Sequence, residues 1–210
     1  MNRHLIKTNY SSPKLVPFSR NEIDVVLENN VYFLYENGRQ WMSYDTNTHI
    51  QALQLFSHYD IAKGHCICTG LGFGVRENWL LKKPDVSKIT IIEKNKNIIE
   101  YNKIINPELM KNAEVVNENV SNYRGRCDTL LLDHYELQSP DYILNNVEHC
   151  IKNIKSQIMW FWPLERYIFR EKGNNLETYK NLAMRHNLFS LPYIDKRKLD
   201  LYIKLFNYNE

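Results

Sequence analysis

The sequence lacks cysteines and histidines spaced as in a metal site. Its four cysteines include no CxxC pair, and its seven histidines form no HxxxH or His-Cys group of metal-binding spacing. We therefore predict no metal centre, and we interpret the cysteines as reduced core residues, because a free thiol behaves as a small hydrophobe. Long apolar runs are also missing, since the longest, around residues 158–164, is far too short to span a bilayer.

The sequence also has little excess charge and no long basic block. It carries 27 basic and 24 acidic residues, for a net charge of +3, so nucleic acid is neither required nor excluded as a partner. The first residues contain no apolar stretch of signal-peptide length, which favours a cytoplasmic protein without membrane contact. Apolar residues make up 43% of the chain and can fill a substantial core, whereas a homodimer is left open.

The first part of the chain, residues 1–64, has a pattern of its own. Residues 1–21 are polar and aperiodic, so we expect an arm that leads into the fold. Three short β-rich runs follow at 25–27, 31–35 and 39–44, and turn residues such as Asn37-Gly38 separate them. Asn-Gly between such runs is a strong hairpin signal, so we predict a small antiparallel meander.

A helix should follow the meander. Asp45 or Thr46 can cap it, and its apolar residues recur at helical spacing, at Ile50, Leu53, Phe56 and Tyr59.

From residue 65 onward, strands and helices alternate. Strands are predicted at 66–69, 89–92, 113–116, 129–132 and 157–162, with helices at 75–81, 95–105, 141–154 and about 176–186. This alternation predicts an α/β fold with a Rossmann-like, mostly parallel sheet and helices on both faces. The last segment resembles two strands, 188–193 and 199–206, which would add an antiparallel C-terminal strand. We divide the chain into residues 1–64 and a nucleotide-binding unit, 65–210.

Polar residues and glycines follow four of the predicted strands directly. In an open α/β sheet the ligand lies beyond the carboxyl ends of the strands, where the strand order reverses. The residues at these ends are the Gly-rich turn 70–74, Glu93, Glu118-Asn119 and the segment 133–136. Glycines let the backbone approach a ligand closely, and Glu93, 23 residues after Gly70, can accept hydrogen bonds from both hydroxyls of a ribose.

Four segments together resemble the cofactor motifs of the class I S-adenosylmethionine (SAM)-dependent methyltransferases, most closely their spermidine-synthase-like branch. They are Cys-Ile-Cys-Thr-Gly-Leu-Gly-Phe-Gly at 66–74, Ile-Ile-Glu-Lys at 91–94, residues 115–123, and Cys-Asp-Thr-Leu-Leu-Leu-Asp at 127–133. The resemblance covers about residues 31–162, because that branch also carries a meander and a helix ahead of the glycine motif.

The resemblance implies a role for each motif residue. The methionine and ribose part of SAM, or of decarboxylated SAM, would lie over the turn residues Gly70, Leu71, Gly72 and Gly74. Glu93 would hold the ribose hydroxyls, Asn119 would meet the adenine, and Asp133 would face the sulfonium end.

The departures from the family pattern concern the amino-acid end of the cofactor and the adenine. Cys68 and Phe73 stand where such families usually place an acid that pairs with the ammonium group of methionine. Asn119 stands where they usually have Asp, although an amide oxygen can still accept a hydrogen bond from the adenine amino group. The missing ammonium partner leaves room for an adenosyl ligand other than SAM.

Catalytic residues are expected in the segment after the fourth strand, where Asp133, His134, Tyr135 and Glu136 follow one another. Asp133 and Glu136 stand where spermidine synthases carry two aspartates that bind and deprotonate an amine, a task suited to a carboxylate pair. The aromatic residues 160–162 end the fifth strand and either pack in the core or form a wall for a flat acceptor. The Tyr-His-Glu pattern of true polyamine synthases is missing from the helix near residue 51.

Three functions remain open from the sequence. The first is methyl transfer from SAM to a small-molecule or protein acceptor, by direct displacement with the groups held in line. The second is aminopropyl transfer from decarboxylated SAM, and the third is SAM binding without catalysis. We expect any acceptor to be bound by residues 1–64 and by the loops after the fourth and fifth strands.

Overall fold

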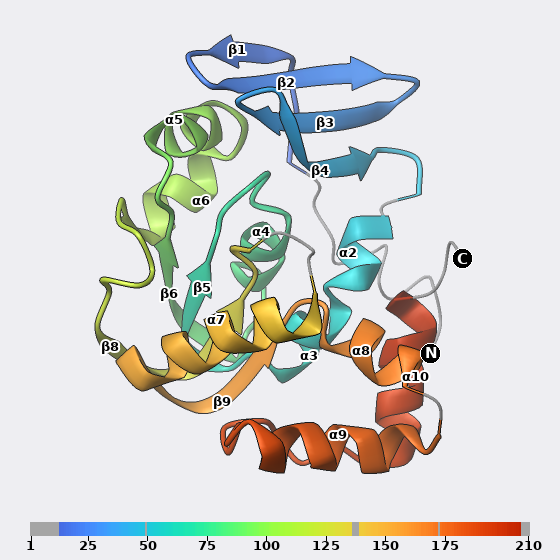
Figure 1. Ribbon diagram of the computed structural model, residues 1–210. Helices are drawn as coiled ribbons and strands as arrows, with labels where there is room; N and C mark the ends of the chain where they lie inside the picture. Colours follow the sequence, from blue (N-terminus) through green and yellow to red (C-terminus); the bar gives the residue numbers. More distant parts are fainter. Residues whose placement is uncertain (1–12, 49, 136–138, 172, 207–210) are drawn as a thin grey trace.

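The computed structural model describes residues 13–48, 50–135, 139–171 and 173–206. These residues form two separate β-sheets, one antiparallel and one parallel, with helices packed around the parallel sheet (Figure 1).

The N-terminal sheet is an antiparallel meander in chain order. Its strands are β1 (Phe18–Arg20), β2 (Ile23–Glu28), β3 (Val31–Glu36) and β4 (Arg39–Asp45). The turn residues Asn37 and Gly38 have φ values of 52° and 73°, as the Asn-Gly pair predicts. The meander prediction is confirmed, but the arm prediction is wrong for Phe18–Arg20, which pairs with β2.

The second sheet contains five parallel strands in the order β7-β6-β5-β8-β9. The strands are β5 (Gly64–Thr69), β6 (Val86–Ile92), β7 (Glu114–Val116), β8 (Gly125–Leu132) and β9 (Ile154–Phe161). Successive strands are added to one side from β5 to β7 and to the other side from β8 to β9. The strand order therefore reverses between β5 and β8, which is where such sheets bind ligands.

Helices cover both faces of the parallel sheet, and in Figure 1 α7 lies in front of it and α4 behind it. The N-terminal sheet lies beyond the end to which β5 points. The helices are α2 (Ile50–Gln54), α3 (Phe56–Ile61), α4 (Val75–Leu80), α5 (Lys96–Ile105), α6 (Pro107–Asn112), α7 (Pro140–Asn153), α8 (Leu164–Arg170), α9 (Asn175–Arg185) and α10 (Lys196–Phe206).

The C-terminal prediction of two strands is wrong. Residues 188–195 form no strand, and the second predicted strand is the helix α10. Its buried residues Leu199, Tyr202, Ile203 and Phe206 follow helical spacing and pack towards α8, α2 and α9. The Tyr202 ring meets Trp160 edge to face, with 5.6 Å between the ring centroids. The predicted antiparallel strand is therefore not formed by the described residues.

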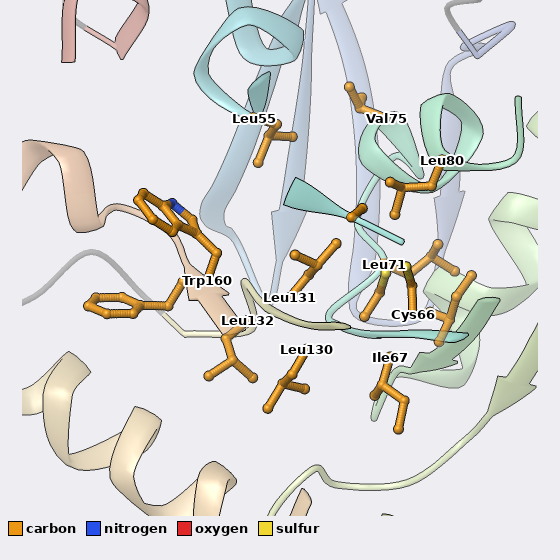
Figure 2. Close-up of a cluster of buried hydrophobic side chains, with 14 of the residues drawn as sticks. Leu55, Cys66, Ile67, Leu71, Val75, Leu80, Leu130, Leu131, Leu132 and Trp160 are labelled. Carbon is orange, nitrogen blue, oxygen red and sulfur yellow. The ribbon is translucent and has the colours of Figure 1, made fainter. Parts of the chain in front are cut away.

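The hydrophobic core fills the space between the parallel sheet and its helices. Figure 2 shows Leu130, Leu131 and Leu132 of β8 beside Ile67 of β5, with side chains of the flanking helices around them. All four cysteines are free and buried, as expected for core residues. Among the described residues, we find no helix with the length and apolar character needed to cross a membrane.

Candidate functional site

A cavity of about 590 Å³ lies at the carboxyl ends of the parallel strands. Both sheets line it, because β4 contributes Trp41 and Met42 while the ends of β5, β6 and β8 contribute the glycine turn, Glu93 and Asp133. The predicted site residues that line it are Gly70, Leu71, Gly72, Glu93, Asn119, Asp133, His134 and Tyr135. Gly74 is not among the lining residues, and Glu136 lies outside the described residues. The structure thus gathers most of the predicted site in one place.

Two glycines of the turn have a left-handed backbone and close neighbours. Gly70 has a φ of +74°, and a Cβ atom there would lie 2.2 Å from the carbonyl oxygen of Asp133. Gly72 has a φ of +49°, and its Cβ would lie 2.5 Å from the sulfur of Met42 on β4. Glycine is therefore needed at position 70 for the approach of the Asp133 backbone, and at both positions it suits the left-handed backbone.

Three asparagines hold the carbonyl groups of the turn. The side-chain amide of Asn102 donates to the Gly72 carbonyl (2.8 Å), and that of Asn106 donates to the Phe73 carbonyl (2.9 Å). The Asn78 amide donates to the Gly74 carbonyl (2.9 Å). Asn102 and Asn106 are buried, so the turn is held by a shielded polar network. Sequence reasoning missed these residues, although Asn102 in α5 and Asn106 at its C-terminal end stand four positions apart, one helical turn.

Glu93 is buried and joins the glycine turn to the start of α5. Its Oε2 accepts the backbone N–H of Leu71 (2.9 Å), and its Oε1 accepts that of Asn95 (2.8 Å). Burial raises the pKa of Glu93, an effect that the two N–H groups oppose and the nearby Glu36 reinforces. Each carboxylate oxygen still has a lone pair for a further donor, as two ribose hydroxyls would require.

Asn119 lines the cavity, but its side-chain oxygen is already engaged. It accepts hydrogen bonds from the backbone N–H of Ser121 (3.0 Å) and from the Ser121 hydroxyl (2.9 Å). We expected this oxygen to accept from an adenine amino group, but in this arrangement both of its lone pairs are in use. The amide N–H₂ remains as the group that Asn119 offers, which suits a ring nitrogen.

Asp133 follows β8 and has a perturbed acidity. Burial raises the pKa of its carboxyl to about 6, while the Arg76 guanidinium opposes this and Glu77 reinforces it. Arg76 is itself buried, is paired with Glu77, and donates to the Gly70 carbonyl (3.0 Å). A carboxylate whose pKa lies just below neutrality is suited to accept a proton. Sequence reasoning missed Arg76 and Glu77, two charges placed immediately after the glycine turn.

The contacts of His134 and Tyr135 favour a structural role. Thr69 Oγ1 accepts the backbone N–H of Asp133 (3.2 Å) and is hydrogen-bonded to Nδ1 of His134 at 2.7 Å. Nε2 of the same ring lies 3.9 Å from the Cys150 sulfur. Burial lowers the pKa of His134 to about 4, helped by the charges of Arg76 and Lys94, and the Tyr135 hydroxyl donates to the Leu132 carbonyl (3.4 Å).

The aromatic residues at the end of β9 divide between core and cavity. Trp160 and Phe161 are fully buried, whereas Trp162 is half-buried and lines the cavity. A second indole, Trp41 of β4, lies opposite the parallel sheet, with the Lys94 ammonium 5.4 Å from its ring centroid. Gln51 also lines the cavity, and its side-chain oxygen accepts the backbone N–H of Asp45 (3.2 Å). The N-terminal sheet and α2 thus supply a wall of the cavity.

No protein-family model and no curated protein matches the sequence. Several solved structures are similar to it. Spermidine synthase from Thermotoga maritima is 15% identical over 66% of this chain and 51% of that chain, with a TM-score of 0.46. A putative RNA methyltransferase from Pyrococcus horikoshii is 16% identical over 67% and 68% of the two chains, with a TM-score of 0.42. The chain therefore spans about half the length of the Thermotoga enzyme it matches.

A SAM-dependent methyltransferase from Clostridium acetobutylicum is also similar, at 11% identity over 52% of this chain and 48% of that chain, with a TM-score of 0.38. The chain has the class I methyltransferase-like fold, which is evident in its own sheet order, its glycine turn after β5 and its acid after β6. A separate antiparallel sheet of four strands precedes β5.

Proposed function

We propose that the protein is a SAM-dependent transferase and that its reaction is methyl transfer to a small-molecule or protein acceptor. The observation that supports this most is the convergence of the glycine turn, Glu93 and Asp133 on one cavity at the point where the strand order reverses. A cavity of about 590 Å³ is within the usual size range for a ligand site.

The residues present fit an adenosyl ligand. The carboxylate of Glu93 is oriented by two backbone N–H groups and keeps lone pairs for ribose hydroxyls. The glycine turn is held in a left-handed conformation by buried amides, so no ordering of the turn is needed when a ligand binds. At the amino-acid end of the ligand, the side chains of Cys68 and Phe73 are fully buried. Neither carries a charge that could pair with the ammonium group of the methionine part of SAM.

The chain would contribute alignment and one proton acceptor. Bound SAM would supply a methyl group on a sulfonium, and the residues of the cavity would hold an acceptor in line with it. Asp133 would take the proton that the acceptor loses, because its pKa of about 6 lets it be ionised at neutral pH and still bind a proton. The cavity walls from Trp41 and Trp162 would hold the acceptor and limit the access of water.

Aminopropyl transfer is the second candidate, favoured by the absence of an acid at Cys68 and Phe73. It requires a pocket for a cationic amine, to which Asp133 would contribute; Glu136, the other acid proposed for it, is not described. Cofactor binding without catalysis is the third candidate. A location in the cytoplasm stays a prediction from the sequence.

Product analysis tests the proposal. The parent, Asp133→Asn and the exposed control Asp141→Asn are incubated with SAM or decarboxylated SAM and pooled acceptors. We expect S-adenosylhomocysteine (SAH) from the parent and the control, and a loss of turnover of about 100-fold or more in Asp133→Asn, the scale of general base catalysis. SAH affinity should stay within about threefold, since the fold and ribose contact survive.

The other outcomes identify the alternatives. Methylthioadenosine formed with consumption of an amine indicates aminopropyl transfer. Tight SAH binding by a parent that yields neither product with any acceptor indicates a binding protein, and no binding of SAH to the parent defeats the proposal.

A further inference from the structure

Asn95 lies between the two sheets and uses each of its polar groups on a different segment. Its backbone N–H donates to Oε1 of Glu93 (2.8 Å), and its side-chain oxygen accepts the backbone N–H of Asn97 at the start of α5 (2.9 Å). Its side-chain amide donates to Oε1 of Glu36, at the end of β3 (2.8 Å). Asn95 is only 7% exposed, so these bonds compete little with water.

These contacts continue as far as the glycine turn. Glu93 accepts the Asn95 N–H with one oxygen and the Leu71 N–H with the other. Three hydrogen bonds therefore connect Glu36 in the N-terminal sheet, through Asn95 and Glu93, to Leu71 in the turn. These hydrogen bonds tie the orientation of Glu93, the predicted ribose acceptor, to the position of β3. Glu36 and Glu93 both line the cavity.

Other contacts attach the N-terminal sheet independently of Asn95. The Tyr101 hydroxyl donates to the Val16 carbonyl (2.8 Å), and the Tyr101 ring packs against Phe18 with 5.0 Å between centroids. The Asn21 amide also donates to the side chain of Asn97 at an exposed position (3.3 Å). Loss of the bond between Glu36 and Asn95 should therefore leave the sheet attached and change only how it is positioned over Glu93.

We propose that Asn95 is a positioning residue that couples the docking of the N-terminal sheet to the binding of an adenosyl ligand at Glu93. This inference rests on the proposed function, because it requires a ligand whose ribose Glu93 holds. Coupling between two sites is reciprocal. A ligand at Glu93 must therefore also strengthen the docking of β3 and β4.

Asn95→Ser isolates the inter-sheet bond. Serine keeps the backbone N–H and the capping oxygen for α5 but lacks the amide that reaches Glu36. Glu36→Ala removes the same bond from the other side, and Asn97→Ser is the matched control, since it removes an exposed contact to the N-terminal sheet that is not linked to Glu93. Calorimetry gives the SAH affinity of each variant and of the Asn95→Ser/Glu36→Ala double variant, and hydrogen exchange of residues 31–45 is measured with and without SAH.

We expect Asn95→Ser and Glu36→Ala each to weaken SAH binding about fivefold, at the lower end of typical coupling. The double variant should be no weaker than either single variant, because both remove one bond. SAH should slow exchange in residues 31–45 of the parent and of Asn97→Ser, but not of Asn95→Ser.

Unchanged SAH affinity in Asn95→Ser would overturn the proposal, even if its thermal stability falls, because Asn95 would then only support the fold. Additive losses in the double variant would also overturn it, since Glu36 would act on the ligand by itself. If the parent does not bind SAH, the proposed function fails and this inference fails with it.

Discussion

Glu165 on α8 is a buried carboxyl group that should make the stability of the protein depend on pH. Its Oε1 accepts hydrogen bonds from Trp160 Nε1 (3.0 Å) and from the Ser57 hydroxyl, whereas its Oε2 is buried and has no hydrogen-bond partner among the described residues. Burial raises the pKa of Glu165 from 4.5 to about 7, and the hydrogen bonds from Ser57 and Trp160 only partly offset this. The folded protein therefore favours the protonated carboxyl group.

The sign of the effect follows from the raised pKa. Between pH 4.5 and about 7 the unfolded chain releases the Glu165 proton while the folded chain keeps it. The contribution of Glu165 to the free energy of unfolding is therefore fully present below pH 4.5. It falls as the pH rises from 4.5 and is lost above about pH 7. A shift of about 2.5 pH units corresponds to about 3 kcal/mol, of which about 2 kcal/mol falls between pH 5.5 and 8.5.

Glu165→Gln should remove this dependence, because an amide does not titrate but keeps an acceptor for Trp160 and Ser57. We expect the free energy of unfolding of the parent to fall between pH 5.5 and 8.5 by about 2 kcal/mol more than that of the variant. Urea titrations at several pH values, followed by tryptophan fluorescence, measure both. The exposed control Glu177→Gln should behave as the parent. Equal pH slopes for parent and Glu165→Gln would refute the reasoning.

Three further predictions concern the cavity. Glu93→Ala should weaken SAH binding by on the order of tenfold or more, since charge-assisted bonds contribute ~1.5–3 kcal/mol; equal affinity by calorimetry would remove Glu93 from the site. Gly70→Ala should lower the free energy of unfolding by at least ~2 kcal/mol, more than Gly38→Ala, because both have positive φ but only Gly70 lies against Asp133. Equal losses in urea titrations would contradict that close contact. Under the proposed function, kcat/KM should rise with pH through about 6, as Asp133 loses its proton, and a flat profile would exclude Asp133 as the base.

The glycine turn, Glu93 and Asp133 could be predicted from the sequence because each follows a short apolar strand directly. The carboxyl ends of parallel strands lie at the same edge of a sheet, so local pattern was enough to bring these residues together. The Asn37-Gly38 turn was equally legible, since its positive φ values are a local property of those residues.

Helix α10 could not be assigned from pattern alone. Leu199, Leu201, Ile203 and Leu205 alternate as in a strand, whereas Leu199, Tyr202, Ile203 and Phe206 follow helical spacing. The choice depends on the packing of Tyr202 against Trp160 and Phe56, residues distant in the sequence.

The same limit applies to the walls of the cavity. The bonds from Asn95 to Glu36 and from Thr69 to His134 join residues 59 and 65 positions apart, and no local period signals such pairs. The sequence by itself determined which residues end the strands, because strand and turn preferences are local. Only the tertiary structure decided that Arg76 donates to the Gly70 carbonyl and that the Thr69 hydroxyl is hydrogen-bonded to His134. It also decided that the N-terminal sheet lies beside Glu93, through the bond from Asn95 to Glu36. These contacts form only when separate elements pack together.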